Sequence, residues 1–145
     1  MESLLVSACL LGFNCKYSGG NNAMPEDVIS ALSAKYRLIP VCPETAGGLS
    51  TPRDPSERQG DRVISQTGRD VTAEYRRGAE TALSLAEKYG CTAALMKENS
   101  PSCGSGTIYD GTFSHVVIPG DGTAAELLKA NGIRVIGESR VSELI

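Results

Sequence analysis

Three cysteines stand where an apolar run ends and a loop rich in glycine, proline or serine begins: Cys9, Cys42 and Cys103. In open α/β sheets, ligands bind in the crevice beyond the carboxyl ends of the strands. Thiols that follow three different strands can therefore meet at one point although they lie far apart in the sequence. Thiolates bind zinc and iron–sulfur clusters. The pattern predicts a shared metal or iron–sulfur site, and the alternative is three ordinary buried cysteines.

The surrounding sequence indicates which kind of metal site the three cysteines could form. None of the three cysteines belongs to a C-x-x-C pair, so zinc-ribbon and thioredoxin-like sites lack their usual signal. His115 is the only histidine, and we expect it to lie outside the site. Three thiolates without a fourth suit a [4Fe–4S] cluster that leaves one iron open. Such an iron is a soft Lewis acid, able to bind a sulfur atom of a substrate.

Polar residues beside the cysteines are candidates for the remaining chemistry. Glu44 follows Cys42 by two residues and could act as a general base or proton relay, or could be a solvated loop carboxylate. Ser100 and Ser102 could hydrogen-bond a substrate or the cluster, or only their own turn. Lys97 could balance anionic charge.

Length and composition exclude several classes of protein. The 145 residues fit one domain, residues 1–145, and the net charge of −3 argues against non-specific binding to nucleic acid or anionic membrane. No run approaches the ~18 apolar residues of a membrane helix. The segment Met1–Cys9 lacks a basic region and is too short for a signal peptide. An odd count of five cysteines fits a reducing compartment, so we expect a cytoplasmic protein.

Strand-like and helix-like patterns alternate along the chain. The apolar runs that predict buried parallel strands are residues 4–8, 38–41, 92–96 and 133–136. Helical spacing predicts helices that begin near Pro25, near Asp70 or Thr72, and after Gly122. Residues 43–61 show no periodicity and are expected to form one long loop, which is either functional or disordered. Asp110-Gly111 between apolar residues of Thr107–Phe113 predicts a hairpin. The fold class is therefore α/β, a small Rossmann-like three-layer fold with a mostly parallel sheet and a β-hairpin insertion.

Several ordered motifs across the chain resemble the bacterial thiouracil desulfidase family. They are Ser7-Ala8-Cys9-Leu10-Leu11-Gly12, Cys15-Lys16-Tyr17-Ser18-Gly19, Cys42-Pro43-Glu44, Gly47-Gly48-Leu49, Thr51-Pro52-Arg53, and Lys97 with Ser100-Pro101-Ser102-Cys103-Gly104. The resemblance implies a [4Fe–4S] cluster on Cys9, Cys42 and Cys103. It also implies that sulfur is removed, without radical chemistry, from 2- or 4-thiouracil-type bases or nucleosides to give a uracil-type product and hydrosulfide.

The resemblance also bears on the roles of single residues. The implied catalytic residues are Glu44 and Ser100, with Glu57 and Asp54 as competing carboxylates in the same segment. Tyr17, Ser102 and Lys97 are the expected substrate-binding residues, and Tyr17 could equally be an ordinary packing residue. Cys15 exceeds the three-ligand count and could be a structural thiol or a competing ligand. The expected partner is a small thiolated base or nucleoside; nucleic acid is not an expected general partner, although thiolated tRNA stays open.

Two other functions are alternatives to this enzymatic function. In one, the same thiolates hold a cluster or a persulfide for delivery to another protein. In the other, the chain is an α/β ligand-binding module whose cysteines have no role.

Overall fold

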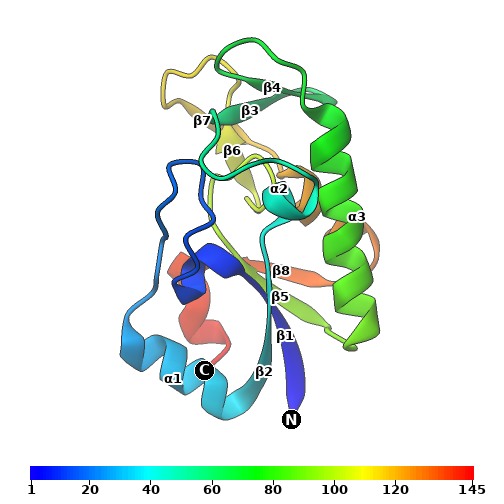
Figure 1. Cartoon of the computed structure of the whole chain (residues 1–145). Helices are drawn as coiled ribbons and strands as arrows, with labels where there is room; N and C mark the ends of the chain where they lie inside the picture. The colour runs from blue at the N-terminus through cyan, green and yellow to red at the C-terminus, as the bar shows by residue number, and fades with distance from the viewer.

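A four-stranded, fully parallel sheet forms the centre of the protein, which a computed structural model describes over all residues, 1–145. The strand order is β2-β1-β5-β8 (Figure 1), and the strands are β1 (Glu2–Ser7), β2 (Tyr36–Val41), β5 (Ala93–Met96) and β8 (Arg134–Gly137). Because β2 is an edge strand, Pro40 costs no hydrogen bond to a second neighbour. No helix is long and apolar enough to cross a membrane.

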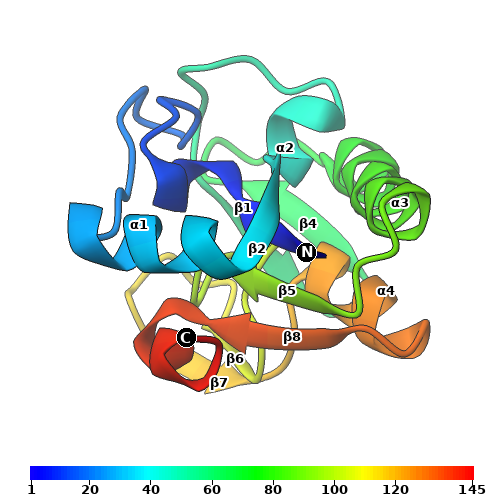
Figure 2. The same cartoon turned by 90° about the horizontal axis from the view of Figure 1, so that it is seen from below.

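Helices cover both faces of the sheet, which gives three layers (Figure 2). The helices are η1 (Ala8–Leu11), α1 (Glu26–Lys35), α2 (Pro43–Ala46), α3 (Thr72–Lys88), α4 (Thr123–Ala130) and η2 (Glu138–Glu143), of which η1 and η2 are 3₁₀ helices. In β1, Leu4 and Val6 pack in one core cluster with Leu32 of α1, whereas Leu5 packs in another with Ala82 of α3. This alternation buries both faces of the sheet, as expected for parallel strands. The predicted fold class is confirmed.

The segment 43–61 differs from its prediction, because it is not one long loop. It begins with the short helix α2 and ends in strand β3 (Ser56–Gln59), which pairs with β4 (Arg62–Ser65) in an antiparallel hairpin. Four-residue elements are too short to show a period in sequence, and this hairpin is polar on its exposed positions. Contacts with other parts of the protein, and not a periodic sequence pattern, stabilise α2 and β3.

The second hairpin also differs in detail. Strand β6 (Thr107–Tyr109) pairs with β7 (Val117–Pro119), so residues 110–116 form a long connecting loop rather than a tight Asp-Gly turn. The Asp110 carboxylate instead accepts hydrogen bonds from the backbone and hydroxyl of Thr112, at 2.9 and 2.6 Å. This local bond competes with a two-residue turn and lengthens the loop.

Helix α2 lies in backbone contact with α3, and two glycines allow this. A Cβ atom on Gly78 would lie 1.8 Å from the Pro43 carbonyl oxygen, and one on Gly47 would lie 1.9 Å from the Glu74 carbonyl oxygen. Neither contact is sterically possible, so any larger residue must push α2 away from α3. The position of α2, which carries Glu44, therefore depends on this glycine contact.

We expect Gly78→Ala to destabilise the protein by about 1–3 kcal/mol, since the clash is with backbone and cannot relax by a side-chain rotation. The sign of the change in the free energy of unfolding is diagnostic, because a glycine-to-alanine substitution inside an unobstructed helix stabilises a protein by up to ~1 kcal/mol. Urea unfolding measures the change. Ser84→Ala, at an exposed position of the same helix, is the control and should stay within about 0.5 kcal/mol of wild type. A Gly78→Ala protein at least as stable as wild type contradicts the packing argument.

Candidate functional site

The cysteines Cys9, Cys42 and Cys103 all line one cavity of about 560 Å³ at the carboxyl ends of the sheet strands. They follow three adjacent strands: Cys9 lies in η1 after β1, Cys42 comes directly after β2, and Cys103 lies in the loop after β5. Adjacent parallel strands end at the same edge of the sheet, so the residues that follow them come together. The structure thus brings together the three thiols that the sequence analysis singled out.

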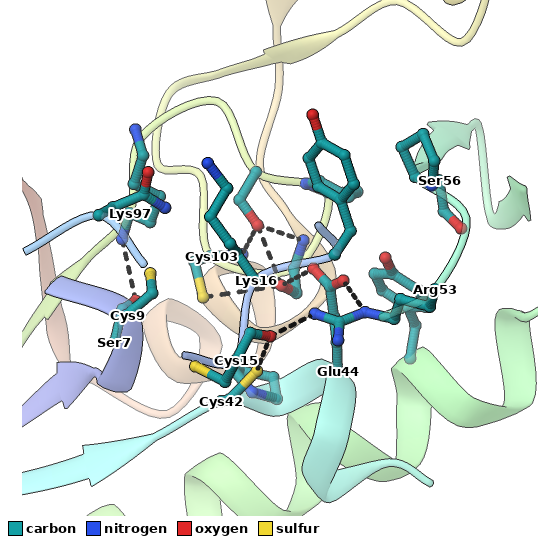
Figure 3. Close-up of a pocket in the computed structure, with 18 of the residues that line it drawn as sticks. Ser7, Cys9, Cys15, Lys16, Cys42, Glu44, Arg53, Ser56, Lys97 and Cys103 are labelled. Atoms are coloured by element: carbon teal, nitrogen blue, oxygen red, sulfur yellow. Dashed lines mark hydrogen bonds and ion pairs between the residues drawn. The ribbon is translucent and has the colours of Figure 1, made fainter. Parts of the chain in front are cut away.

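A fourth thiol, Cys15, faces the same space (Figure 3). Its backbone carbonyl oxygen accepts hydrogen bonds from the Cys42 thiol, with the sulfur 3.7 Å away, and from Arg53 Nη2 at 2.8 Å. Cys15 comes from the loop between η1 and α1, whereas the other three cysteines follow strands. Cys91, by contrast, is buried in the core and does not line the cavity.

The donor set fits an iron–sulfur cluster better than a single ion. No three cysteine, histidine or acidic side chains converge closely enough to hold one metal ion. In a [4Fe–4S] cluster each thiolate binds a different iron, so the sulfur atoms must stand farther apart than around one ion. Three thiols spread around one cavity meet that requirement.

Burial favours the protonated form of three of the cavity thiols, Cys9, Cys15 and Cys103, in the absence of a metal. It raises the pKa of Cys103 to about 12, with a smaller contribution from Cys9, although hydrogen bonds from Ser7 and Ser102 oppose it. Burial also raises the pKa of Cys15 to about 12, with Cys42 as the next cause, and raises the pKa of Cys9. Iron cations supply the positive charge that makes thiolates stable in such a place, so cluster binding here must release protons.

Glu44 of α2 is held in a buried ion pair at the cavity. Its Oε1 accepts a hydrogen bond from Arg53 Nε at 3.0 Å, and the two side chains are only 15% and 7% exposed. Its Oε2 accepts a hydrogen bond from the Ser102 hydroxyl at 2.9 Å. The buried hydroxyl of Tyr75 is also within hydrogen-bonding reach of Glu44. These partners hold the carboxylate in a fixed orientation at the cavity.

Ser100 and Ser102 extend this hydrogen-bond network, and both line the cavity. The Ser100 oxygen accepts hydrogen bonds from the backbone N–H of Ser102 and of Cys103, at 3.1 and 3.0 Å, and lies 3.0 Å from the Ser102 hydroxyl. Each hydroxyl has one proton to donate. When Ser102 donates to Glu44, the Ser100 hydroxyl is left to donate to Ser102. The three residues form a hydrogen-bonded chain in the order Ser100, Ser102, Glu44.

Lys97 and Tyr17 line the cavity as well. Lys97 Nζ forms an ion pair with Glu138 Oε2 at 2.7 Å, and its charge acts on the Cys9 thiol. The Tyr17 side chain is 47% exposed, and the ammonium group of Lys16 lies 5.9 Å from its ring centre. Lys97 is therefore placed to offset negative charge near Cys9, and Tyr17 is free to contact a ligand.

Several cavity residues were missed or misplaced by the sequence analysis. Neither Arg53 nor Tyr75 was assigned a role, yet both contact Glu44. His115, which was expected to lie outside the site, lines the cavity. Asp54 does not line it, whereas Glu57 does. The motif that contains Arg53 was a usable signal, because arginine is the residue of choice for buried pairs with a carboxylate; no sequence signal marked Tyr75 or His115.

Known proteins are similar to this chain over almost its whole length. The family model described as 2-thiouracil desulfurase matches residues 4–140. A solved structure titled "[4Fe-4S]-dependent thiouracil desulfidase TudS" is similar to this chain with a TM-score of 0.95 and 49% sequence identity, covering 99% of this chain and 95% of that one. The uncharacterized protein YbbK of Bacillus subtilis (strain 168) is 41% identical over 152 residues, which is 98% of this chain and 99% of YbbK. The resemblance seen in the cysteine motifs is confirmed, and the chain belongs to the 2-thiouracil desulfurase family.

Proposed function

We propose that this protein hydrolyses the carbon–sulfur bond of a thiolated pyrimidine with a [4Fe–4S] cluster held by Cys9, Cys42 and Cys103. The observation that carries the proposal is that the thiols following three adjacent strands line the same cavity as the buried Glu44–Arg53 pair. Family membership and 49% identity to a [4Fe-4S]-dependent thiouracil desulfidase make the coarser assignment: this chain is an iron–sulfur-dependent thiouracil desulfidase.

The cluster and the protein have separate tasks in this reaction. When bound, the cluster supplies an iron without a protein ligand, a soft Lewis acid suited to a thiocarbonyl sulfur. Water must add to the ring carbon that bears the sulfur, and sulfide must leave. The net change is thiopyrimidine plus water to the oxo-pyrimidine plus hydrogen sulfide, with no change in oxidation state.

Glu44 is the residue that takes the proton from the attacking water. A general base must be held in place and must lie at the cavity, and the ion pair with Arg53 holds Glu44 there. The chain Ser100–Ser102–Glu44 then offers a path by which the proton returns toward the substrate. Asp54 lies outside the cavity, and Glu57 is held by a different loop, so neither is the proposed base.

The substrates are small. A thiolated base or nucleoside such as 2- or 4-thiouracil or 4-thiouridine is proposed, with Tyr17 against the ring and Lys97 near the cluster to offset its negative charge. Aromatic side chains bind flat rings through offset stacking. We further infer a cytoplasmic location, because all five cysteines are free thiols, as is usual in a reducing compartment.

We expect Ser102→Ala to lower kcat for desulfuration about tenfold or more, since it interrupts the hydrogen-bonded chain and removes the hydroxyl that donates to Glu44 Oε2. The iron content should not change. Steady-state kinetics with a solvent isotope effect measures the loss. Ser105→Ala removes a hydroxyl that bonds the Val135 carbonyl oxygen away from the cavity, and it should behave as wild type. Equal kcat for Ser102→Ala and wild type is incompatible with a relay through Ser102.

The function is tested by anaerobic reconstitution followed by incubation with 2-thiouracil and 4-thiouracil. We expect brown protein with about four iron atoms per chain, loss of the thiocarbonyl absorption, and one sulfide released per uracil formed. A reconstituted protein that holds iron but releases no sulfide from either base would point instead to a cluster or sulfur carrier. A colourless protein without iron would contradict both the desulfidase function and the function as a cluster carrier.

A further inference from the structure

A buried acidic residue in the cavity has no part in the proposed chemistry. We propose that Glu57 of β3 is a substrate-recognition residue: one carboxylate oxygen fixes the β6–β7 loop, and the other accepts a hydrogen bond from a ring N–H of the thiolated pyrimidine. This inference rests on the proposed function and adds to it the group that recognises the substrate ring.

One oxygen of Glu57 holds the loop 110–116 in place. Glu57 Oε1 accepts hydrogen bonds from the backbone N–H of Gly111 at 2.9 Å and of Phe113 at 3.1 Å. Gln59 Nε2 adds a hydrogen bond to the Gly111 carbonyl oxygen at 2.9 Å. The loop needs such support, because Phe113 has a φ of 59°, in the left-handed region that non-glycine residues seldom adopt. Figure 1 shows β3 beside β6 and β7 at the end of the molecule beyond the sheet.

The other oxygen of Glu57 is left for a ligand. Glu57 is 8% exposed, and none of the salt bridges of the protein includes it. Its Oε2 has no hydrogen-bond partner in the protein, yet it is not among the buried atoms that lack one, so a solvent molecule can reach it. Glu57 lines the cavity, so we assign its unpaired Oε2 to the ligand side. A buried carboxylate with a free lone pair strongly favours a hydrogen-bond donor.

The neighbourhood of Glu57 matches the ring of a pyrimidine. The loop that it fixes contributes Phe113 and His115 to the cavity wall, and β6 contributes Tyr109. The rings of Tyr109 and His115 pack edge to face, with 6.2 Å between their centres. A thiouracil ring has aromatic-like faces and N–H donors at its edge. Stacking accepts any flat ring, whereas the carboxylate accepts only a ring that offers an N–H.

Glu57→Gln separates the two tasks of this side chain. The amide oxygen of glutamine can still accept the two backbone hydrogen bonds, so the loop keeps its place. The amide NH₂ then replaces Oε2 and meets the ring N–H as a second donor, so the recognition bond is lost. We expect the Kd of the loaded enzyme for uracil, a ligand with the same ring N–H groups and no sulfur to remove, to rise at least about tenfold. The KM for 4-thiouracil should rise with it, and kcat should change much less.

Ring methylation gives a second, independent measurement. 1-Methyluracil and 3-methyluracil each lack one N–H, and the isomer that lacks the recognised N–H should bind wild type at least about tenfold more weakly than uracil does. The same isomer should lose little further affinity in Glu57→Ala, which has room for the methyl group and no carboxylate. Asp54→Asn, at an exposed residue outside the cavity, is the control and should bind all three rings as wild type does.

The outcomes distinguish this inference from the proposed function. Iron content and visible absorption should be the same in Glu57→Gln and wild type, which shows that the cluster is intact. If wild type desulfurates thiouracil but Glu57→Gln binds uracil with unchanged Kd, the recognition role is wrong and the function stands. If wild type releases no sulfide at all, the function itself fails, and the binding measurements with uracil still decide whether Glu57 reads the ring.

Discussion

Replacing Cys42 with serine is expected to remove the cluster. Cys42 follows β2 and lines the cavity, and a serine hydroxyl at the same place is a poor ligand for iron in a cluster. We expect the iron content after anaerobic reconstitution to fall at least tenfold from about four atoms per chain, with loss of the brown colour and of desulfuration. Iron and sulfide analysis together with the visible spectrum measure this. Cys9→Ser and Cys103→Ser should give the same result.

Cys15→Ser is the critical comparison for this ligand set, because its thiol faces the same space. The loop that carries Cys15 does not follow a strand, and its Cys15 carbonyl oxygen accepts a hydrogen bond from Arg53 Nη2 at 2.8 Å. We expect Cys15→Ser to keep its iron, as should Cys91→Ser in the core. If Cys15→Ser loses the cluster and one of the other three variants keeps it, Cys15 replaces that residue as the third ligand. The cavity is then still the place where the cluster binds.

Glu44→Gln is expected to lower kcat by about 10²- to 10⁴-fold, the usual size of a general-base contribution, while the iron content stays at the wild-type level. The amide oxygen of glutamine can still accept the hydrogen bond from Arg53, and its NH₂ then faces the Ser102 hydroxyl as a donor, but the amide cannot take a proton from water. Single-turnover measurement of sulfide release with saturating 4-thiouracil isolates this step from substrate binding.

The same variant should also be less stable, because it leaves the Arg53 guanidinium, which is 7% exposed, without its counter-charge. We expect a loss of about 3 kcal/mol in the free energy of unfolding, since removing one partner of a buried pair strands the other charge. Asp54→Asn is the control for both measurements, as its carboxylate is exposed and bonds only to the Thr67 hydroxyl. Full activity in Glu44→Gln would move the role of base to another group.

The parts of the fold that follow from short-range patterns were predicted from the sequence. The strands of the parallel sheet and the helices α1, α3 and α4 have local signals: apolar runs, helical spacing, and glycine or proline at their ends. The convergence of Cys9, Cys42 and Cys103 needed one more step, the rule that parallel strands end together at one edge. That rule applies however far apart the three cysteines lie in the sequence.

The short elements α2 and β3 were not predicted, because their stability comes from partners far away in the sequence. Helix α2 exists where Gly47 and Gly78 let two backbones touch, and β3 exists where it pairs with β4 and supports the loop 110–116. Four residues cannot form a stable helix or strand alone, so their sequences hold no period to read.

By itself, then, the sequence determined the sheet, the thiols at its edge, and the candidate acid Glu44 beside them, because each depends on local patterns or on strand topology. Only the tertiary structure decided what those groups touch: Arg53 and Ser102 on Glu44, Cys15 beside Cys42, and Glu57 under the β6–β7 loop. The physical reason is that such contacts are a few ångströms long and join residues up to 58 positions apart. Their geometry depends on how all the loops pack together, which no short stretch of sequence specifies.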